Sequence, residues 1–247
     1  MTAFSERLGN DATIGTFLKL PIVESVEMMA VAGMDLIVID LEHSSMSLES
    51  ASHILAVAKA LQLGTLVRIP SHGYEWIQRS LDAGANGVLI PHVDTKEQAS
   101  AAVAAAHFPP EGTRGFSPTT RAGEWSIGGG DLYRRSENDV AVVVQIESSA
   151  GVDNVKSIIE AGVDSVFVGP ADLSVAMGVA VDSRELEDAR SLVLSSAREQ
   201  GVPCGIAAGN GTLARELIAD GFSYAVVGND ATMLGERAER LVEEFRN

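Results

Sequence analysis

Apolar residues in this chain gather in short unbroken runs, and most runs are followed by a stretch with helical spacing. The run Val140–Ile146 is rich in β-branched residues, which is typical of a strand buried on both faces. Residues Val152–Ala161 place apolar side chains on one side of a helix, and Gly162 ends that helix. Ser165–Val168 is a second short apolar run. The pattern predicts two parallel strands joined by a helix.

One phrase of the sequence occurs four times. It reads AGMDLIVID from Ala32, AGANGVLIP from Ala83, AGVDSVFVG from Ala161 and, more loosely, DGFSYAVVG from Asp220. Each copy combines the end of a helix at Gly, a short loop and a buried strand. Four further strands are predicted at Ile14–Leu18, Thr65–Ile69, Val140–Ile146 and Cys204–Ala207.

Helical spacing fills the intervals between these strands. The predicted helices are Glu24–Val31, Leu48–Leu61, Glu75–Ala83, Lys96–Phe108, Val152–Ala161, Arg184–Gln200, Thr212–Ala219 and Ala231–Glu244. Strict alternation of eight buried strands with helices favours a closed barrel over an open sheet. The sequence therefore predicts an α/β fold, a single (β/α)8 TIM-barrel domain over residues 1–247.

Residues 109–138 interrupt this alternation. The segment PPEGTRGFSPTTRAGEWSIGGGDLYRRSEN is polar and has no clear periodicity. An irregular segment of this length inside a compact domain is usually a lid, a binding loop or a disordered stretch. Because it comes after the fourth strand, we expect it to lie over the C-terminal face of the barrel.

Composition narrows the partners and the setting. Hydrophobic residues make up 46% and charged residues 21%, and the formal net charge is −16. This charge argues against nucleic acid or an anionic membrane as a partner. The single cysteine, Cys204, excludes an intramolecular disulfide and favours a cytoplasmic location, and its apolar neighbours indicate a packed core thiol. The sequence also has no run long enough to cross a bilayer and no signal peptide at its start.

Two predicted neighbouring strands each end in a carboxylate. Glu147 follows the fifth strand, and Asp172 follows the sixth in the turn Gly169-Pro170-Ala171-Asp172. Strands in a sheet lie about 4.8 Å apart, so both carboxylates can bind one divalent cation such as Mg²⁺ or Mn²⁺. The amides of Ala171 and Asp172 open a helix and can hold an anionic ligand. The alternative is that Asp172 only caps this helix and that Glu147 is a surface acid.

Other polar residues end the second and third strands. His43, in the phrase Asp40-Leu41-Glu42-His43, is a candidate general base because its ordinary pKa lies near neutrality. Arg68 ends the third strand and suits a carboxylate or a developing enolate oxygen. The alternatives are a histidine satisfied within its loop and an arginine paired with Glu42. Convergence of these residues with Gln145, Glu147 and Asp172 on one rim favours a functional site.

At this point the chain resembles a known family. The phrases DLEHS, RIP after Val67, LDAGANGVLIP, PPEGTRGFSP, QIES and VGPADLS, in this order, are similar to the HpcH/HpaI aldolase family and cover nearly the whole chain. The resemblance implies a class II pyruvate aldolase on a TIM barrel that depends on a divalent metal (Mg²⁺, Mn²⁺ or Co²⁺). It also implies a homo-oligomer, a hexamer built as a trimer of dimers.

The resemblance further implies roles for individual residues. Glu147 and Asp172 become the metal ligands, and Gln145 lines the metal site. Arg68 contacts the pyruvate oxygens, while the amides of Ala171 and Asp172 receive the substrate carboxylate. His43 becomes the base, with Asp40 nearby and with Asp82 of the adjacent subunit as its partner. The strong alternative is that Asp82 is an ordinary solvated surface residue.

The implied reaction is reversible aldol cleavage of 4-hydroxy-2-oxo acids to pyruvate and an aldehyde. Alternatives are a CoA-ester lyase, an oxaloacetate decarboxylase or a TIM-barrel enzyme with a phosphorylated substrate. A Schiff-base mechanism needs a lysine in the barrel, and Lys19 is the sole candidate. Two residues depart from the family pattern: Phe17 stands where Trp is common, and His92 where an apolar residue, often Met, is expected. Arg121, in the long loop, is a further candidate for contact with the substrate.

Overall fold

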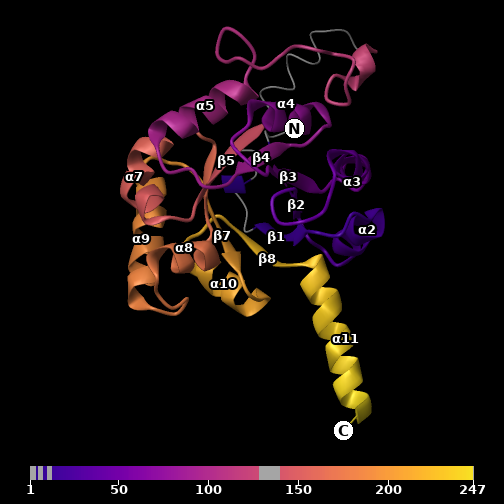
Figure 1. The fold of residues 1–247 in the computed structure, drawn as a ribbon, viewed down its shortest axis with the longest axis vertical. Coiled ribbons are helices and arrows are strands. Elements are labelled where there is room, and N and C mark those ends of the chain that lie inside the picture. Colours follow the sequence, from indigo (N-terminus) through magenta and orange to yellow (C-terminus); the bar gives the residue numbers. More distant parts are fainter. Residues whose placement is uncertain (1–3, 5–7, 10–12, 128–139, 247) are drawn as a thin grey trace.

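Eight parallel strands close into a barrel in the computed structural model, which describes residues 4, 8–9, 13–127 and 140–246 (Figure 1). Each strand pairs with the next along the chain, and the last pairs with the first. The strands are β1 (Thr13–Leu18), β2 (Leu36–Asp40), β3 (Gly64–Arg68), β4 (Gly87–Ile90), β5 (Ala141–Ile146), β6 (Ser165–Val168), β7 (Cys204–Ala208) and β8 (Tyr224–Asn229). The predicted TIM barrel is confirmed.

Helices follow the strands and cover most of the outside of the barrel. They are α2 (Val23–Val31), α3 (Leu48–Ala60), α4 (Tyr74–Asp82), α5 (Lys96–Ala106), α7 (Ser149–Ile159), α8 (Pro170–Met177), α9 (Arg184–Glu199), α10 (Gly211–Asp220) and α11 (Asp230–Arg246). Several begin at a polar cap: the side chains of Ser47, Ser148 and Ser183 each accept a hydrogen bond from an amide of the first helical turn. The turn predicted after Gly169 is a complete helix, α8.

Two apolar layers result from the alternation of side chains along each strand. One layer fills the barrel interior with residues such as Val38, Leu66 and Phe167. The other packs the strands against the helices with residues such as Ile39, Val67 and Val144. A strand covered on both sides must be apolar at nearly every position, which explains the unbroken apolar runs of the sequence.

The long irregular segment does not lie where we expected. Within its described part, residues 109–127, the amide of Thr113 donates to the Ala104 carbonyl near the end of α5. The amide of Ala122 donates to the Asp82 carbonyl at the end of α4. Helices of this fold run antiparallel to the strands, so their C-terminal ends lie at the N-terminal face of the barrel. The expectation for residues 109–127 was wrong because α5 returns the chain to that face before the loop begins. Residues 128–138 of the predicted loop lie outside the described residues.

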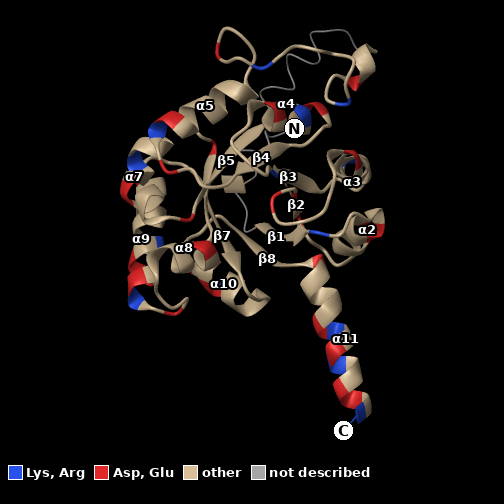
Figure 2. Cartoon of the chain, viewed as in Figure 1, with Lys and Arg blue, Asp and Glu red and all other residues tan. Residues whose placement is uncertain are grey.

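The last helix, α11, projects away from the barrel (Figure 1). Of its residues only Asp230, at its start, is buried. Charged residues of both signs cover much of its surface (Figure 2). The apolar side chains of Leu234, Leu241, Val242 and Phe245 are nevertheless exposed. Within the described ranges, none of the helices combines the length and the apolar character that a membrane span requires.

Close packing at Gly205 gives a test of the barrel interior. A Cβ atom at Gly205, in β7, would lie 2.1 Å from Cζ of the buried Tyr224 ring. We expect Gly205→Ala to lower the free energy of unfolding by about 1–3 kcal/mol, since the ring has to move in a filled core. Gly209→Ala is the matched control, because no atom lies within 4 Å of its added Cβ. Urea denaturation measures both, and equal stabilities of the two variants would contradict the packing.

Candidate active site

The strand alternation that fills the barrel also aims a set of polar side chains at its C-terminal mouth. Phe17, Val38 and Leu66 point into the interior. Two positions further along the chain come Lys19, directly after β1, and Asp40 and Arg68, the last residues of β2 and β3. Side chains two apart leave the same face of a strand. The same rule applies to β5, where Val143 in the interior is followed by Gln145 and Glu147.

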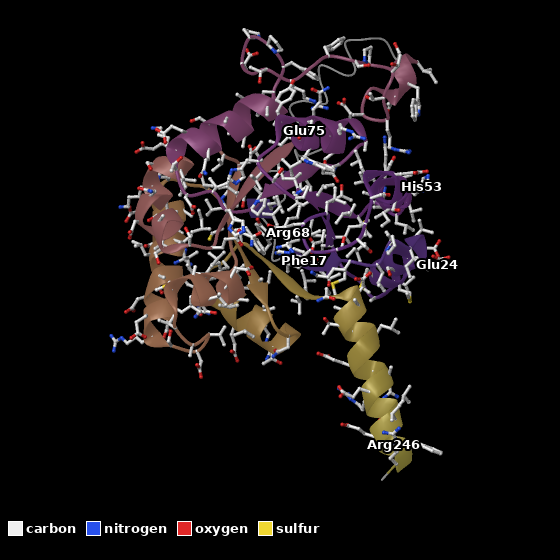
Figure 3. All side chains as sticks on the ribbon, viewed as in Figure 1. Phe17, Glu24, His53, Arg68, Glu75 and Arg246 are labelled. Carbon is white, nitrogen blue, oxygen red and sulfur yellow. The ribbon has the colours of Figure 1, made fainter. Side chains whose placement is uncertain are left out.

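Asp40 and Arg68 form a buried pair at the centre of this mouth. Nε and Nη2 of Arg68 donate to the two carboxylate oxygens of Asp40 at 3.0 and 2.7 Å. The guanidinium lies over the Phe17 ring, with Cζ 4.7 Å from the ring centroid. Both residues lie near the centre of the barrel in Figure 3. Its Nη1 lies 3.3 Å from Oε2 of Glu42. These contacts fix the plane of Arg68 and leave its other N–H groups for a ligand.

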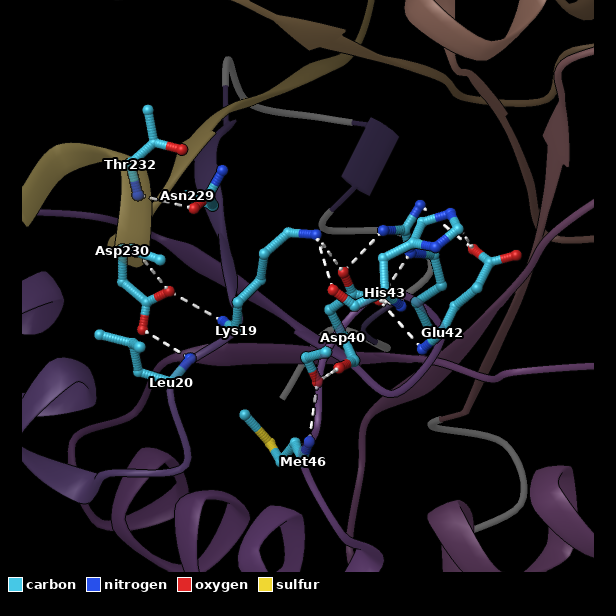
Figure 4. A network of polar contacts seen from close by, with 12 residues as sticks. Lys19, Leu20, Asp40, Glu42, His43, Met46, Asn229, Asp230 and Thr232 are labelled. Carbon is cyan, nitrogen blue, oxygen red and sulfur yellow. Dashed lines mark hydrogen bonds and ion pairs between the residues drawn. The ribbon is translucent and has the colours of Figure 1, made fainter. Parts of the chain in front are cut away.

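The charge of Asp40 is stabilised by its surroundings. Burial alone would raise the pKa of this carboxyl, but the hydrogen bonds and charge of Arg68 lower the pKa to about 2. Lys19 assists, since its Nζ lies 3.0 Å from Oδ2 of Asp40. Oδ1 also accepts hydrogen bonds from the amides of Glu42 and His43 at 3.1 Å (Figure 4). Asp40 thereby orients both Arg68 and the loop that carries His43.

His43 lies at the mouth with 54% of its side chain exposed. Its Nε2 is 3.6 Å from Oε2 of Glu42, and its backbone carbonyl accepts a hydrogen bond from Nζ of Lys19 at 3.1 Å. Asp40, which the family resemblance places near this base, accepts a hydrogen bond from the backbone amide of His43. Lys19, the sole candidate for a Schiff base, forms an ion pair with Asp40 at the rim and donates to the His43 carbonyl.

Glu147 is buried beside Gln145 at the end of β5. Nε2 of Gln145 donates to Oε2 of Glu147, while the amide of His92 donates to Oε1 at 2.7 Å. Burial raises the pKa of Glu147 above its ordinary value, and the nearby carboxylates of Asp172 and Glu42 act in the same direction. His92 opposes this rise. The carboxylates that follow β2, β5 and β6 are therefore close enough to interact electrostatically at the mouth.

This arrangement fits a hard divalent cation. Asp172 lies in the first turn of α8 and repels Glu147 electrostatically. Gln145 Oε1 is buried and accepts no hydrogen bond. A Cβ at Gly169 would lie 2.7 Å from Nε2 of Gln145, so only Gly leaves this space open. Among the described residues no three His, Cys, Asp or Glu side chains converge into a complete metal site. Mg²⁺ commonly needs only one or two carboxylates, with substrate and water as the other ligands.

Asp82 and Arg121 lie away from the mouth of their own barrel. Asp82 ends α4, where its Oδ1 lies 2.7 Å from Nη2 of the buried Arg114. Arg121 packs beside Gly84, which follows the same helix. Both line a hollow of about 300 Å³ together with Trp125. The pairing of Asp82 with His43 of an adjacent subunit stays a prediction.

Sequence reasoning missed the contacts of His92, Phe17 and Asp230. His92 touches Glu147, and Phe17 supports Arg68. Asp230 accepts hydrogen bonds from the amides of Lys19 and Leu20, which ties the start of α11 to the end of β1 (Figure 4). Strand parity could have indicated Phe17, which lies two positions before Lys19. The predicted core thiol is confirmed: Cys204 is 2% exposed, and burial raises its pKa.

Comparison with known proteins places this geometry in a family. The family model for HpcH/HpaI aldolase/citrate lyase matches residues 13–236. The chain belongs to this family. Over 236 residues it is 35% identical to the 5-keto-4-deoxy-D-glucarate aldolase of Klebsiella pneumoniae, covering 94% of this chain and 92% of that protein. The predicted family is thereby confirmed.

Solved structures agree with the family assignment. A HpcH/HpaI aldolase/citrate lyase family protein from Burkholderia cenocepacia superposes with a TM-score of 0.92, at 32% identity and 98% coverage of both chains. The HpcH/HpaI aldolase from Desulfitobacterium hafniense gives a TM-score of 0.90 at 26% identity, with 96% of this chain and 93% of that chain covered. The prediction of an enzyme, a class II aldolase and carbon–carbon lyase that forms pyruvate and an aldehyde-type product, is confirmed. Class II aldolases of this family are divalent-metal dependent in general.

Replacing Asp40 by Asn tests the buried pair. The pKa of the Asp40 carboxyl falls from 3.8 in the unfolded chain to about 2 in the folded protein. Asp40 therefore stabilises the folded protein at pH values above 3.8, and this contribution is lost as the pH falls toward about 2. The shift corresponds to about 2 kcal/mol at neutral pH. We expect Asp40→Asn to lower the free energy of unfolding at neutral pH by at least that amount. The deficit should shrink below about pH 4 in urea denaturation. A deficit independent of pH would contradict this role.

Proposed function

We propose that this HpcH/HpaI family enzyme cleaves a 4-hydroxy-2-oxo acid of the 5-keto-4-deoxy-glucarate type, using Glu147 and Asp172 as its metal ligands. The observation that carries the proposal is the cluster at the C-terminal mouth. There the carboxylates of Glu147 and Asp172 lie close enough to repel each other, and Asp40 fixes the guanidinium of Arg68 at the same mouth. Groups of opposite charge on one rim suit a substrate that carries both a carboxylate and a developing oxyanion.

The anionic end of the substrate has two binding partners in this proposal. The amides of Ala171 and Asp172 open α8 directly after Pro170, where a helix has free donors and a favourable dipole. Arg68 offers the N–H groups that Asp40 and Glu42 leave unused. A divalent cation (Mg²⁺, Mn²⁺ or Co²⁺) held by Glu147 and Asp172, with Gln145 beside it, supplies Lewis-acid stabilisation of charge on the 2-oxo group.

His43 is the base of the proposed reaction. Its exposed ring lies at the mouth, and Asp40 and Lys19 fix the backbone on which it stands. His43 accepts the proton of the 4-hydroxyl, the bond between C3 and C4 breaks, and the bonding electron pair passes into the enolate of pyruvate. Arg68 stabilises the charge of that enolate. A proton then adds at C3, which completes pyruvate.

The relatives' substrate fixes the chemical class of the second product. Cleavage of a six-carbon 5-keto-4-deoxy sugar diacid between C3 and C4, counted from the oxo acid end, leaves pyruvate and a three-carbon aldehyde that bears a carboxylate. The Klebsiella pneumoniae relative is a 5-keto-4-deoxy-D-glucarate aldolase. We infer that this chain accepts such an acidic aldehyde.

Glu147→Gln tests the metal assignment. The substitution keeps the shape of the side chain but removes its charge, and the loss of several kcal/mol of charge stabilisation corresponds to at least roughly a hundredfold lower rate. We expect Mn²⁺ binding in equilibrium dialysis to be lost and pyruvate release from 5-keto-4-deoxy-D-glucarate to fall by that factor. A chelator should abolish the same activity in the unmodified enzyme.

Glu160→Gln is the control for this experiment. Glu160 is exposed on the outer surface, where it pairs with Lys96 at 3.1 Å, so both Mn²⁺ binding and turnover should be unchanged. Turnover retained in Glu147→Gln, or an unmodified enzyme insensitive to the chelator, would refute the assignment.

We also infer that the enzyme acts as a homo-oligomer, in line with the predicted trimer of dimers. The projecting α11 exposes Leu234, Leu241 and Phe245 at 65%, 50% and 89%. On the barrel itself, Met28 and Val31 of α2 are exposed as well. Burial of both sets between copies removes apolar surface from water. We also propose a cytoplasmic location, because the chain has a single cysteine and cannot form an intramolecular disulfide.

Light scattering tests the assembly. We expect several chains per particle for the unmodified protein, and a smaller mass for Leu234→Ser combined with Leu241→Ser, because both changes make the exposed stripe of α11 polar. Glu239→Gln, a polar exchange on the same helix, should keep the original mass. One chain per particle in the unmodified protein would exclude the assembly, and with it the pairing of Asp82 across subunits.

A further inference from the structure

We propose that His92 is a positioning residue that holds one oxygen of Glu147 and directs the other toward the cation. This inference rests on the proposed function, because it assigns a role to His92 only if Glu147 binds a metal. It concerns a residue for which the sequence left open a contact with the substrate or a histidine satisfied at the rim, at a position where an apolar side chain was expected.

The backbone of His92 adopts a left-handed conformation, with φ +52°. Few residues other than Gly do so, and His is among those enriched there. The turn brings the backbone amide of His92 within 2.7 Å of Oε1 of Glu147, and ring Nδ1 within 3.0 Å of the same oxygen. His92 thus contacts one carboxylate oxygen twice, through a hydrogen bond from its amide and an ion-pair contact from its ring.

Counting acceptor positions shows what remains for a ligand. A carboxylate oxygen has about two lone-pair sites. On Oε1 of Glu147 the amide of His92 occupies one site, and the ring of His92 lies against the same oxygen. On Oε2 one site accepts from Nε2 of Gln145, which leaves one free. The oxygen with the free site is therefore Oε2.

Oε2 also faces the correct side. It lies 3.3 Å from the Cβ position of Gly169, at the end of β6, whereas Oε1 faces the residue after β4 and Pro91. Asp172 follows Gly169 by three positions. The free site of Glu147 thus opens toward the element that carries the second proposed ligand, and His92 holds the carboxylate from the opposite side.

The second ring nitrogen extends this support across the mouth. Nε2 of His92 lies 3.7 Å from Oε1 of Glu42, so the ring spans the space between the ends of β2 and β5. Replacing a residue that orients a metal ligand commonly lowers metal affinity by roughly 10- to 100-fold. His92 therefore sets how firmly Glu147 is held before the cation arrives.

Two substitutions separate the ring contact from the backbone turn. Asn and Gly both tolerate a positive φ, so neither His92→Asn nor His92→Gly strains the chain. The amide Nδ2 of Asn occupies the place of Nδ1 in His and can still donate to Glu147, whereas Gly keeps only the backbone donor. A third variant, His53→Phe, changes an exposed histidine on α3 and serves as the control.

The measurement is Mn²⁺ binding to the full-length oligomeric protein, followed by electron paramagnetic resonance of the free ion. We expect roughly tenfold weaker binding in His92→Gly, near-normal binding in His92→Asn and no change in His53→Phe. Equal affinity in His92→Gly and the unmodified protein, or failure of Asn to restore binding, would overturn the role of His92. An unmodified protein that binds no Mn²⁺ would instead refute the proposed function itself.

Discussion

The buried pair of Asp40 and Arg68 is the interaction on which the mouth of the barrel depends. Two charges removed from water are costly unless each finds partners of good geometry. Asp40 is fully buried, and it receives two N–H groups of Arg68, the ammonium of Lys19 and two backbone amides. The same contacts that offset its desolvation hold the guanidinium over the Phe17 ring and shape the loop of His43. The contacts that stabilise the buried charge of Asp40 therefore also orient Arg68 and the loop of His43.

Opposite charges are separated across this mouth. The ends of β1 and β3 carry the cations Lys19 and Arg68, which share the single carboxylate of Asp40. The ends of β5 and β6 carry Glu147 and Asp172, whose mutual repulsion is unrelieved by a nearby lysine or arginine among the described residues. The acidic half of the mouth suits a cation, and the basic half suits an anionic substrate. A reaction that forms an enolate beside a carboxylate needs both kinds of stabilisation.

The single chain also presents surfaces that its own barrel leaves uncovered. α11 projects from the end of β8, and Asp82 lies with residues 109–127 at the face opposite to the mouth. Exposed apolar side chains on α11 suit contact with another copy. The proposed assembly would explain why Asp82, which the family resemblance implicates, lies far from the mouth of its own barrel.

The sequence by itself determined the barrel and the rim residues. A strand packed on both sides is apolar throughout, and a polar residue in phase with its inward side chains falls at the mouth, as Arg68 and Glu147 do. Only the tertiary structure decided which rim groups meet. The partners of Asp40 and Glu147 come from other strands, 28 and 55 positions away along the chain for Arg68 and His92. Spacing along one strand carries no information on distances across the barrel, so these contacts follow from its closure alone. The face of the barrel on which residues 109–127 lie could have been predicted from the sequence, because the helix before them returns the chain to the N-terminal face.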